Sequence, residues 1–370
     1  MTAIYLDHNA TTPLAPGVLE VMTRYLATDF GNPSSGHHFG AAPREAVAAA
    51  RQQLAALLGA PADRIFFTGC GSEANTLAIT GALMGRAGQV ITQATEHPAV
   101  LQTCHALAPQ GIRVTVLPVD ADGLVNPTDL ADALTDDTLL VSVMHANNET
   151  GTIQPIVELG ALAHSAGALF HTDAAQTAGK IAFTVEQLGV DLLSVAGHKF
   201  GGPKGVGALY VREGVELSPV IRGGGQEGGL RSGTENVAGI AGIGAAAEYS
   251  AKTPRDQLAV LRNELQRLLV DALGDRVRLN GHPTFRLPNT LNVSIAGTVG
   301  AHLLAATPGL AASTGSACHD GSIGSPVLAA MGYGGERAAA AIRLSVGRPT
   351  SDADIREAAR LLVSAVHTMG

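Results

Sequence analysis

The chain of 370 residues is too long for one small core and fits one large domain with a smaller one. Hydrophobic residues make up 46% and charged residues 15%, with 45 glycines, which is typical of a buried, helix-covered sheet with tight turns. The formal net charge of −8 provides no basic patch for a phosphate backbone, which argues against nucleic acid as a partner.

The first stretch, MTAIYLDHNATT, places Asp7 early and lacks the basic-then-apolar order of a targeting peptide. No later apolar run approaches a membrane span without an interrupting glycine or charge. We therefore expect a cytoplasmic protein without membrane contact. The three cysteines, Cys70, Cys104 and Cys318, form no CxxC pair, which argues against a disulfide framework and a structural metal site.

The first two thirds of the chain predict an α/β fold. After a polar turn at the end of residues 1–12 and a loop at 30–40, residues 43–58 predict a helix with Pro43 in its first turn. Strand-like segments then alternate with stretches long enough for crossover helices. The predicted strands are 64–68, 89–92, 113–117, 139–144, 168–172, 192–195 and 208–212. This alternation predicts a mainly parallel, doubly wound sheet.

The pattern changes near Thr253 and predicts a smaller α+β domain. A long amphipathic helix to residue 273 is followed by strands at 290–295 and 343–346, with the Cys318 loop between them, and by a last helix capped by Ser351. We expect residues 1–12 to complete this domain. The predicted division is a large domain of residues 13–252 and a small domain of residues 1–12 and 253–370, which carries the cysteine loop.

Polar segments, three of which contain glycine, follow several predicted strands. They read GCGSEAN, QATEHPAV, HANNETG, DAAQ and AGHKFGG. Ligands of open α/β sheets bind at the carboxyl ends of the strands, so these segments predict a ligand site at one edge of the sheet.

Lys199 lies in the last of these segments, in a chain where lysine is scarce. A surface lysine just past a strand is the plain interpretation. The alternative is a lysine that forms a Schiff base, because burial lowers the pKa of an amine enough to leave a nucleophile. Asp173 follows another strand, where a buried carboxylate needs a partner such as a pyridinium nitrogen.

Three further features are compatible with a cofactor site but do not by themselves predict one. Residues 69–75 join a strand to a helix and could hold a phosphate at the helix start, although Gly-Ser is also an ordinary cap. His97 could stack on an aromatic ring or cap the following helix. Gln176 faces the same way as Asp173 if a helical turn begins there.

Taken together, the motifs resemble those of the cysteine desulfurases, which are pyridoxal-phosphate enzymes of the class V aminotransferase group. The motifs occur in the family's order and span nearly the whole chain: LDHNATTP, FGNPSS, TGCGSEAN, TEHPAV, MHANNETG, HTDAAQ, GHKFGGPKGVGALYVR, GGGQEGGLRSGTEN, TLNVSI, STGSACHDG and IRLSVGR. The resemblance implies the fold-type I architecture and pyridoxal 5′-phosphate as cofactor.

The resemblance also implies a role for each matching residue. The implied catalytic residues are Lys199 (Schiff base), Cys318 (sulfur carrier) and His97 (ring stacking and proton transfer). The implied cofactor-binding residues are Gly71, Ser72, His97, Asn148, Asp173 (ring nitrogen), Gln176 (ring oxygen), His198, Lys199 and Thr234, the last toward the neighbouring subunit's phosphate. The implied substrate-binding residues are Asn32, Asn148 and Arg343.

The implied reaction converts L-cysteine to L-alanine and leaves the sulfur as a persulfide on Cys318. The sulfur then passes to an acceptor or scaffold protein, for iron–sulfur clusters or other sulfur-containing products. A contact from Thr234 to a neighbouring cofactor implies a homodimer with shared sites.

The chain departs from the family pattern at a few positions. Ala196 stands where most bacterial housekeeping enzymes have serine, which removes one hydrogen bond to the phosphate. His319 replaces the usual threonine after Cys318, as in selenocysteine lyases. The sequence ends at Gly370 without the long tail by which some desulfurases contact a scaffold. We expect Cys70 and Cys104 to be small buried hydrophobes.

Three alternatives to a cysteine desulfurase stay open at this point. A selenocysteine lyase would release selenide and L-alanine from L-selenocysteine. An aminotransferase or lyase of the same fold would not use Cys318. A non-catalytic dimeric relative would serve only as a partner or scaffold, although Lys199, Asp173 and Arg343 argue against a degenerate site.

Overall fold

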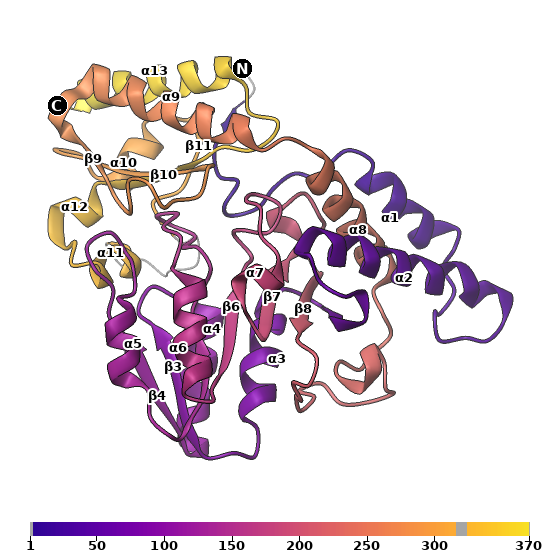
Figure 1. Cartoon of the computed structure of the whole chain (residues 1–370). Coiled ribbons are helices and arrows are strands. Elements are labelled where there is room, and N and C mark those ends of the chain that lie inside the picture. Colours follow the sequence, from indigo (N-terminus) through magenta and orange to yellow (C-terminus); the bar gives the residue numbers. More distant parts are fainter. Residues whose placement is uncertain (1–2, 316–323, 370) are drawn as a thin grey trace.

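The computed structural model describes residues 3–315 and 324–369 (Figure 1). Its centre is a seven-stranded sheet with the order β2-β8-β7-β6-β5-β3-β4. The strands are β2 (Ile65–Thr68), β3 (Gly88–Gln93), β4 (Ile112–Leu117), β5 (Thr138–Ser142), β6 (Leu169–Asp173), β7 (Leu192–Ala196) and β8 (Gly207–Val211). The seven predicted strands are therefore confirmed, and their ends differ from the prediction by no more than two residues.

One strand of this sheet runs against the others. β8 is antiparallel to both of its neighbours, β2 and β7, whereas the remaining pairs are parallel. The connection from β7 to β8, residues 197–206, contains only a single 3₁₀ turn (Gly197–Lys199) and is too short for a helical crossover, so the chain turns back beside β7. The prediction of a mainly parallel sheet is confirmed.

Helices cover both faces of the sheet, as a doubly wound fold requires. On one face α3 (Gly71–Leu83) and α4 (Pro98–Leu107) bury residues such as Leu77 and Leu107 against the strands. On the other face lie α2 (His38–Leu58), α5 (Pro127–Ala133), α6 (Ile156–Ser165), α7 (Val185–Leu188) and α8 (Val237–Lys252). Each face therefore has its own apolar core.

The start of α2 corrects the sequence prediction. The helix begins at His38, and Pro43 is a buried residue inside it rather than in its first turn. The helix therefore has an extra turn before the proline. The Arg44 guanidinium donates to the backbone oxygens of Pro33 and Ser35 and so holds the preceding loop beside this turn. Gly59 ends the helix in the left-handed conformation.

The carboxyl-terminal part forms a second, smaller layer. Strands β9 (Val277–Leu279), β10 (Thr290–Ile295) and β12 (Ala341–Ser345) form an antiparallel sheet in the order β12-β10-β9. Helices α9 (Asp256–Leu273) and α13 (Asp352–Met369) pack on it around a core that includes Leu265, Leu291 and Leu362. Three short helices, α10 (Gly300–Ala305), α11 (Pro326–Ala330) and α12 (Gly335–Ala339), complete the region.

The first residues join this smaller layer. Strand β1 (Ile4–Tyr5) pairs in parallel with β11 (Leu310–Ala311), and Leu6 is part of the small core. Asp7 then bridges to Ser345 at the end of β12. On these separate cores we propose the division into residues 13–252 and residues 1–12 with 253–370.

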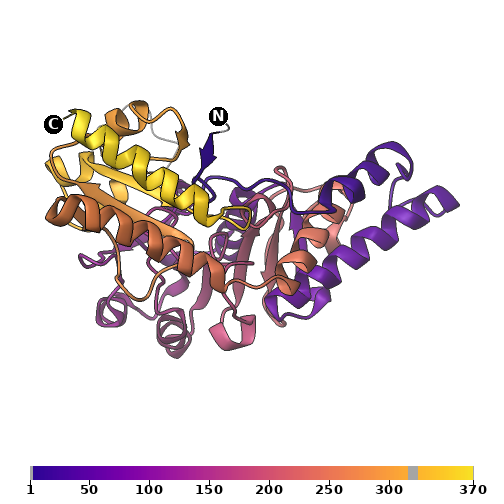
Figure 2. The ribbon, with the colours of Figure 1, turned by 90° about the horizontal axis from the view of Figure 1, so that it is seen from above.

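Two views show the arrangement of the parts. Helix α1 (Val18–Ala27) and the start of α2 project from one end of the molecule, and α13 lies over the opposite end (Figures 1 and 2). Within the described residues, no helix has both the length and the apolar character needed to cross a bilayer. In the same residues, no group of three His, Cys, Asp or Glu side chains could hold a metal ion.

Candidate active site

A cavity of about 270 Å³ lies at the carboxyl edge of the large sheet. Strands β2, β5, β6 and β7 end beside it, and the first residues of the chain close it from the small-layer side. It brings together many of the predicted site residues, namely Gly71, Ser72, His97, Asn148, Asp173, Gln176, His198, Lys199 and Arg343. Segments that are far apart in the sequence therefore meet in one site.

Lys199 lies at the end of the 3₁₀ turn that follows β7 and is half-buried. Its Nζ donates hydrogen bonds to the backbone oxygens of Asn9 (2.8 Å) and Ala10 (2.9 Å). These carbonyl groups hold the amine at the cavity wall. The surface-lysine interpretation is therefore wrong for this residue.

His198 is held beside Lys199 by the amino-terminal segment. Its Nδ1 lies 3.1 Å from Oγ1 of Thr11. Burial, followed by the nearby charges of Lys199 and Lys204, lowers the pKa of His198 to about 4. The imidazole is therefore neutral at neutral pH and is able to donate or accept one hydrogen bond in the cavity.

Asp173 is the last residue of β6 and is buried. Its Oδ2 accepts from Nδ2 of Asn75 (2.7 Å), and its Oδ1 accepts from the backbone N–H of Ala175 (2.8 Å). Among the described residues these donors are neutral, so the carboxylate has no cation as a direct partner there. A buried carboxylate in this position is suited to a protonated ring nitrogen.

Gln176 follows in a helical turn, as the sequence suggested. The backbone N–H groups of Thr177 and Ala178 both bond to the oxygen of Ala174. The Gln176 Nε2 donates to the backbone oxygen of Asn9 at 3.0 Å. The same Asn9 oxygen thus receives a hydrogen bond from Gln176 and one from Lys199.

The first turn of α3 forms another part of the wall. Gly71 is its first residue, and a side chain there would place a Cβ only 2.9 Å from the Cβ of Ala196. Glycine therefore lets the helix start approach the end of β7 closely. The leading N–H groups of a helix lack intrahelical partners and favour an anion, so this end of the cavity suits a phosphate.

The two described cysteines differ, and one corrects the sequence prediction. Cys104 is buried in the core, and burial raises the pKa of its thiol to about 12. Cys70 is exposed and lines the cavity. It caps α3, where its Sγ accepts the backbone N–H of Glu73, so its position at the helix start keeps it out of the core.

The capping role predicted for His97 is confirmed, and the stacking role stays a prediction. It is the N-cap of α4, and its Nδ1 accepts the backbone N–H of Ala99 at 3.1 Å. The ring also lines the cavity. Because the cap fixes Nδ1 as an acceptor, the proton of a neutral ring resides on Nε2.

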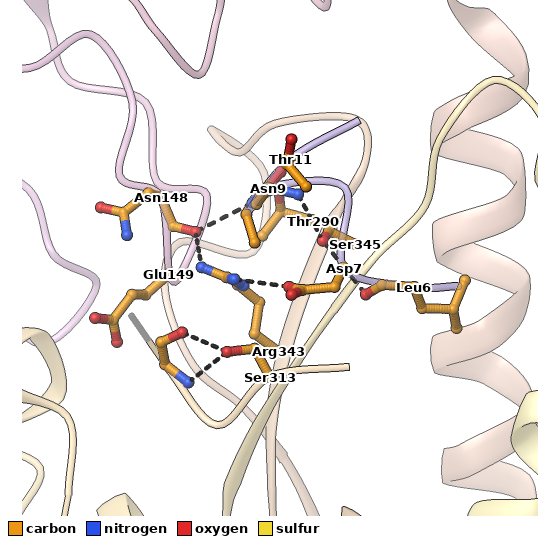
Figure 3. Close-up of polar contacts among 12 residues, drawn as sticks. Leu6, Asp7, Asn9, Thr11, Asn148, Glu149, Thr290, Ser313, Arg343 and Ser345 are labelled. Carbon is orange, nitrogen blue, oxygen red and sulfur yellow. Dashed lines mark hydrogen bonds and ion pairs between the residues drawn. The ribbon is translucent and has the colours of Figure 1, made fainter. Parts of the chain in front are cut away.

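Arg343 lies on β12 and is almost completely buried. Figure 3 shows its guanidinium between two acceptors from distant segments, the carboxylate Oδ1 of Asp7 (2.8 Å) and the backbone oxygen of Asn148 (3.0 Å). Its Nε is buried without a hydrogen-bond partner among the described residues. The Arg343 guanidinium therefore still has N–H donors for a further carboxylate at the cavity.

Three predicted site residues are not part of this arrangement. Asn32, in the loop before α2, and Thr234, in the loop before α8, are exposed and do not line the cavity. Cys318 lies outside the described residues, as does His319.

Sequence reasoning missed two residues that organise the site. Asn9 is buried and contacts Lys199, Gln176 and Lys180. Asp7 holds Arg343. Both belong to the LDHNATTP motif, so the signal was present, but their partners lie more than 160 residues away.

Comparisons with known proteins agree with this geometry. The aminotransferase class-V family matches residues 4–357. The chain is 47% identical over 361 residues to cysteine desulfurase IscS of Dictyoglomus turgidum, covering 95% of this chain and 91% of that protein. It is 44% identical over 360 residues to cysteine desulfurase IscS of Methanosarcina thermophila, covering 95% and 89%.

Solved structures give the same picture. A NifS-like protein superposes with a TM-score of 0.92 at 36% identity and covers 99% of this chain and 100% of its own. SspA in complex with cysteine superposes with a TM-score of 0.84 at 37% identity and covers 92% of this chain and 98% of its own.

Proposed function

The chain belongs to the aminotransferase class-V family, and from this premise we propose that it is a pyridoxal-phosphate-dependent cysteine desulfurase. It converts L-cysteine to L-alanine and transfers the sulfur. The observation that carries the proposal is the single cavity in which Lys199, Asp173 and Arg343 meet at the carboxyl edge of the sheet.

The donors and acceptors of the cavity fit pyridoxal 5′-phosphate. The N-terminal end of α3, with Gly71 and Ser72, suits the phosphate, and the buried Asp173 suits the ring nitrogen. The Lys199 amine lies within reach of the same cavity. Asn75 supports the fit, because its Oδ1 is buried without a partner in the described part of the chain.

When bound, the cofactor supplies the electron sink that allows an amino acid to lose its α proton. In the proposed mechanism Lys199 Nζ takes this proton and later returns it. Its two carbonyl acceptors, on Asn9 and Ala10, hold the amine at the wall before it engages. Asp173 would keep the ring nitrogen protonated, and His97, which lines the cavity, would serve as a second proton carrier.

Arg343 is the proposed binding group for the substrate carboxylate, with Asn148 beside it at the cavity. Asn32 stays a predicted substrate-binding residue, because it does not line this cavity. The guanidinium is already oriented by Asp7 and by the Asn148 oxygen, so little side-chain freedom is lost when a carboxylate binds. The buried, unpartnered Nε supports this role.

Cys318 is the proposed sulfur carrier. Its thiolate attacks the substrate sulfur, so that a new S–S bond forms while the substrate C–S bond breaks. The electron pair of the C–S bond stays with the carbon, which takes up a proton and becomes the methyl group of alanine. The persulfide on Cys318 then passes its outer sulfur to an acceptor thiol.

We further propose a homodimer in which Thr234 serves the partner's site. The exposed position of Thr234, away from its own cavity, supports this arrangement. The projecting α1–α2 region also exposes large apolar side chains, which a second subunit would cover: Leu19, Leu26, Phe30 and Phe39.

The test is alanine release from L-cysteine and from L-selenocysteine by the cofactor-loaded protein, with a reductant present. We expect the wild type to release alanine from L-cysteine, and Cys318→Ala to lose at least about two orders of magnitude of that rate. Full activity in Cys318→Ala would instead indicate a lyase or aminotransferase. Turnover of L-selenocysteine alone would indicate a selenocysteine lyase.

A further inference from the structure

Lys180 is a buried lysine with no established part in the reaction. It is 6% exposed and lies at the end of the turn that carries Gln176. Its Nζ donates to Oε1 of Gln176 (2.7 Å) and to Oδ1 of Asn9 (3.1 Å). These two partners are neutral side-chain oxygens, and both residues line the cavity.

The charges around Lys180 favour its neutral form. Burial lowers its pKa well below the usual value, and the cations Lys199 and Arg343, on other elements, lower it further. His8 and His198 also interact with it, and the pKa of each is lowered to about 4. An amine donates hydrogen bonds in either charge state, so the two contacts to Gln176 and Asn9 define the role of Lys180.

The hydrogen bonds fix the orientation of the Gln176 amide. The Asn9 backbone oxygen can only accept, so Nε2 of Gln176 faces it. Lys180 donates on the other side, where Oε1 of Gln176 accepts. The second N–H of Nε2 is then left for a ligand, which makes Gln176 a donor toward the cavity.

We propose that Lys180 is a positioning residue that holds the Gln176 amide as a hydrogen-bond donor toward the ring oxygen of bound pyridoxal 5′-phosphate. The proposal rests on the proposed function, because it needs that cofactor in the cavity. Without Lys180, Oε1 of Gln176 loses its donor and the amide is free to turn.

The experiment compares wild type with Lys180→Met in the cofactor-loaded enzyme. The readouts are the dissociation constant of pyridoxal 5′-phosphate and the pH midpoint of the visible absorption of the bound cofactor. We expect about fivefold weaker binding, the effect of one hydrogen bond. We also expect the pH midpoint to rise by about half a unit, because a ring oxygen without its donor holds a proton more tightly.

The matched control is Lys252→Met, which makes the same change at an exposed lysine on α8. It should leave both readouts unchanged. Lys180→Gln keeps an N–H donor without the charge, and its midpoint should stay closer to the wild-type value than that of Lys180→Met. It also serves as the test variant if the methionine protein does not fold.

A double-mutant cycle separates positioning from packing. If Lys180 acts through Gln176, then Lys180→Met causes no further shift of the midpoint in a Gln176→Leu background. An unchanged midpoint and dissociation constant in Lys180→Met, with only a lower melting temperature, would overturn the proposal. A wild-type protein that does not bind the cofactor would instead overturn the proposed function itself.

Discussion

The cavity has two walls that are built in different ways. The strand-end wall consists of residues 71–72, 97, 173–176 and 196–199, which follow neighbouring strands of the large sheet. Once the sheet forms, these residues lie side by side, because parallel strands end at the same edge. The proposed cofactor contacts are almost all on this wall.

The second wall, the Arg343 wall, consists of Asn9, Asn148 and Arg343, together with Asp7, the ion-pair partner of Arg343. Its contacts join residues that are 195 and 336 positions apart, and they form only when the first residues, the large sheet and β12 come together. The difference indicates that the two walls have separate roles, one in cofactor binding and one in substrate binding. The strand-end wall is set mainly by the large sheet, whereas the Arg343 wall depends on how the first residues, the large sheet and β12 meet.

The largest effect that we expect comes from acid and acts on buried histidines beside the strand-end wall. His145, after β5, and His171, in β6, are buried, and burial lowers the pKa of each to about 4. An unfolded histidine titrates near 6.5, so between pH 6.5 and pH 4 the unfolded chain binds more protons than the folded one. The free energy of unfolding therefore falls as the pH drops through this window, by roughly 3 kcal/mol for each histidine, and does not fall further for this reason below pH 4.

Urea unfolding of the protein at several pH values checks this expectation. His171→Gln should make the decline between pH 6.5 and 4 shallower. His105→Gln, at an exposed histidine on α4, controls for the loss of one imidazole. An unchanged decline in His171→Gln would mean that acid acts elsewhere, for example on the Arg343 wall.

The next effect concerns the Arg343 wall alone. Arg343→Lys keeps the charge but loses the planar fork, so we expect the KM for L-cysteine to rise about tenfold to a hundredfold. The dissociation constant of pyridoxal 5′-phosphate should stay within about twofold, because the strand-end wall is untouched. Arg360→Lys, at an exposed arginine on α13, is the control. If the KM and the cofactor dissociation constant rose by the same factor, the two walls would not have separate roles.

The same comparison explains how much the sequence could predict. The strand-end wall follows from local patterns, since a strand followed by a polar segment is visible in the sequence. This pattern located Asp173, Lys199 and the α3 start without knowledge of the fold. The family resemblance, not any local pattern, located Arg343.

Such local patterns do not predict contacts between residues that are far apart in the sequence. Asn9 looked like part of a polar turn, and nothing near it indicates that its oxygen accepts from both Lys199 and Gln176. Cys70 was wrongly expected in the core, because its exposure depends on where α3 meets β7. The reversal of β8 likewise depends on the short connection after Lys199.

The smallest effect that we expect is a gain in cofactor affinity from a change at Ala196, on the strand-end wall. This residue ends β7, lines the cavity, and places its methyl group beside the first residue of α3. Ala196→Ser adds a donor at the proposed phosphate end, so we expect about fivefold tighter binding of pyridoxal 5′-phosphate, the effect of one hydrogen bond. The KM for L-cysteine should not change. Ala131→Ser, at an exposed alanine on α5, is the control and should leave cofactor affinity unchanged. If Ala196→Ser altered the KM instead, the two walls would not act separately, because a change at the phosphate end would have reached Arg343.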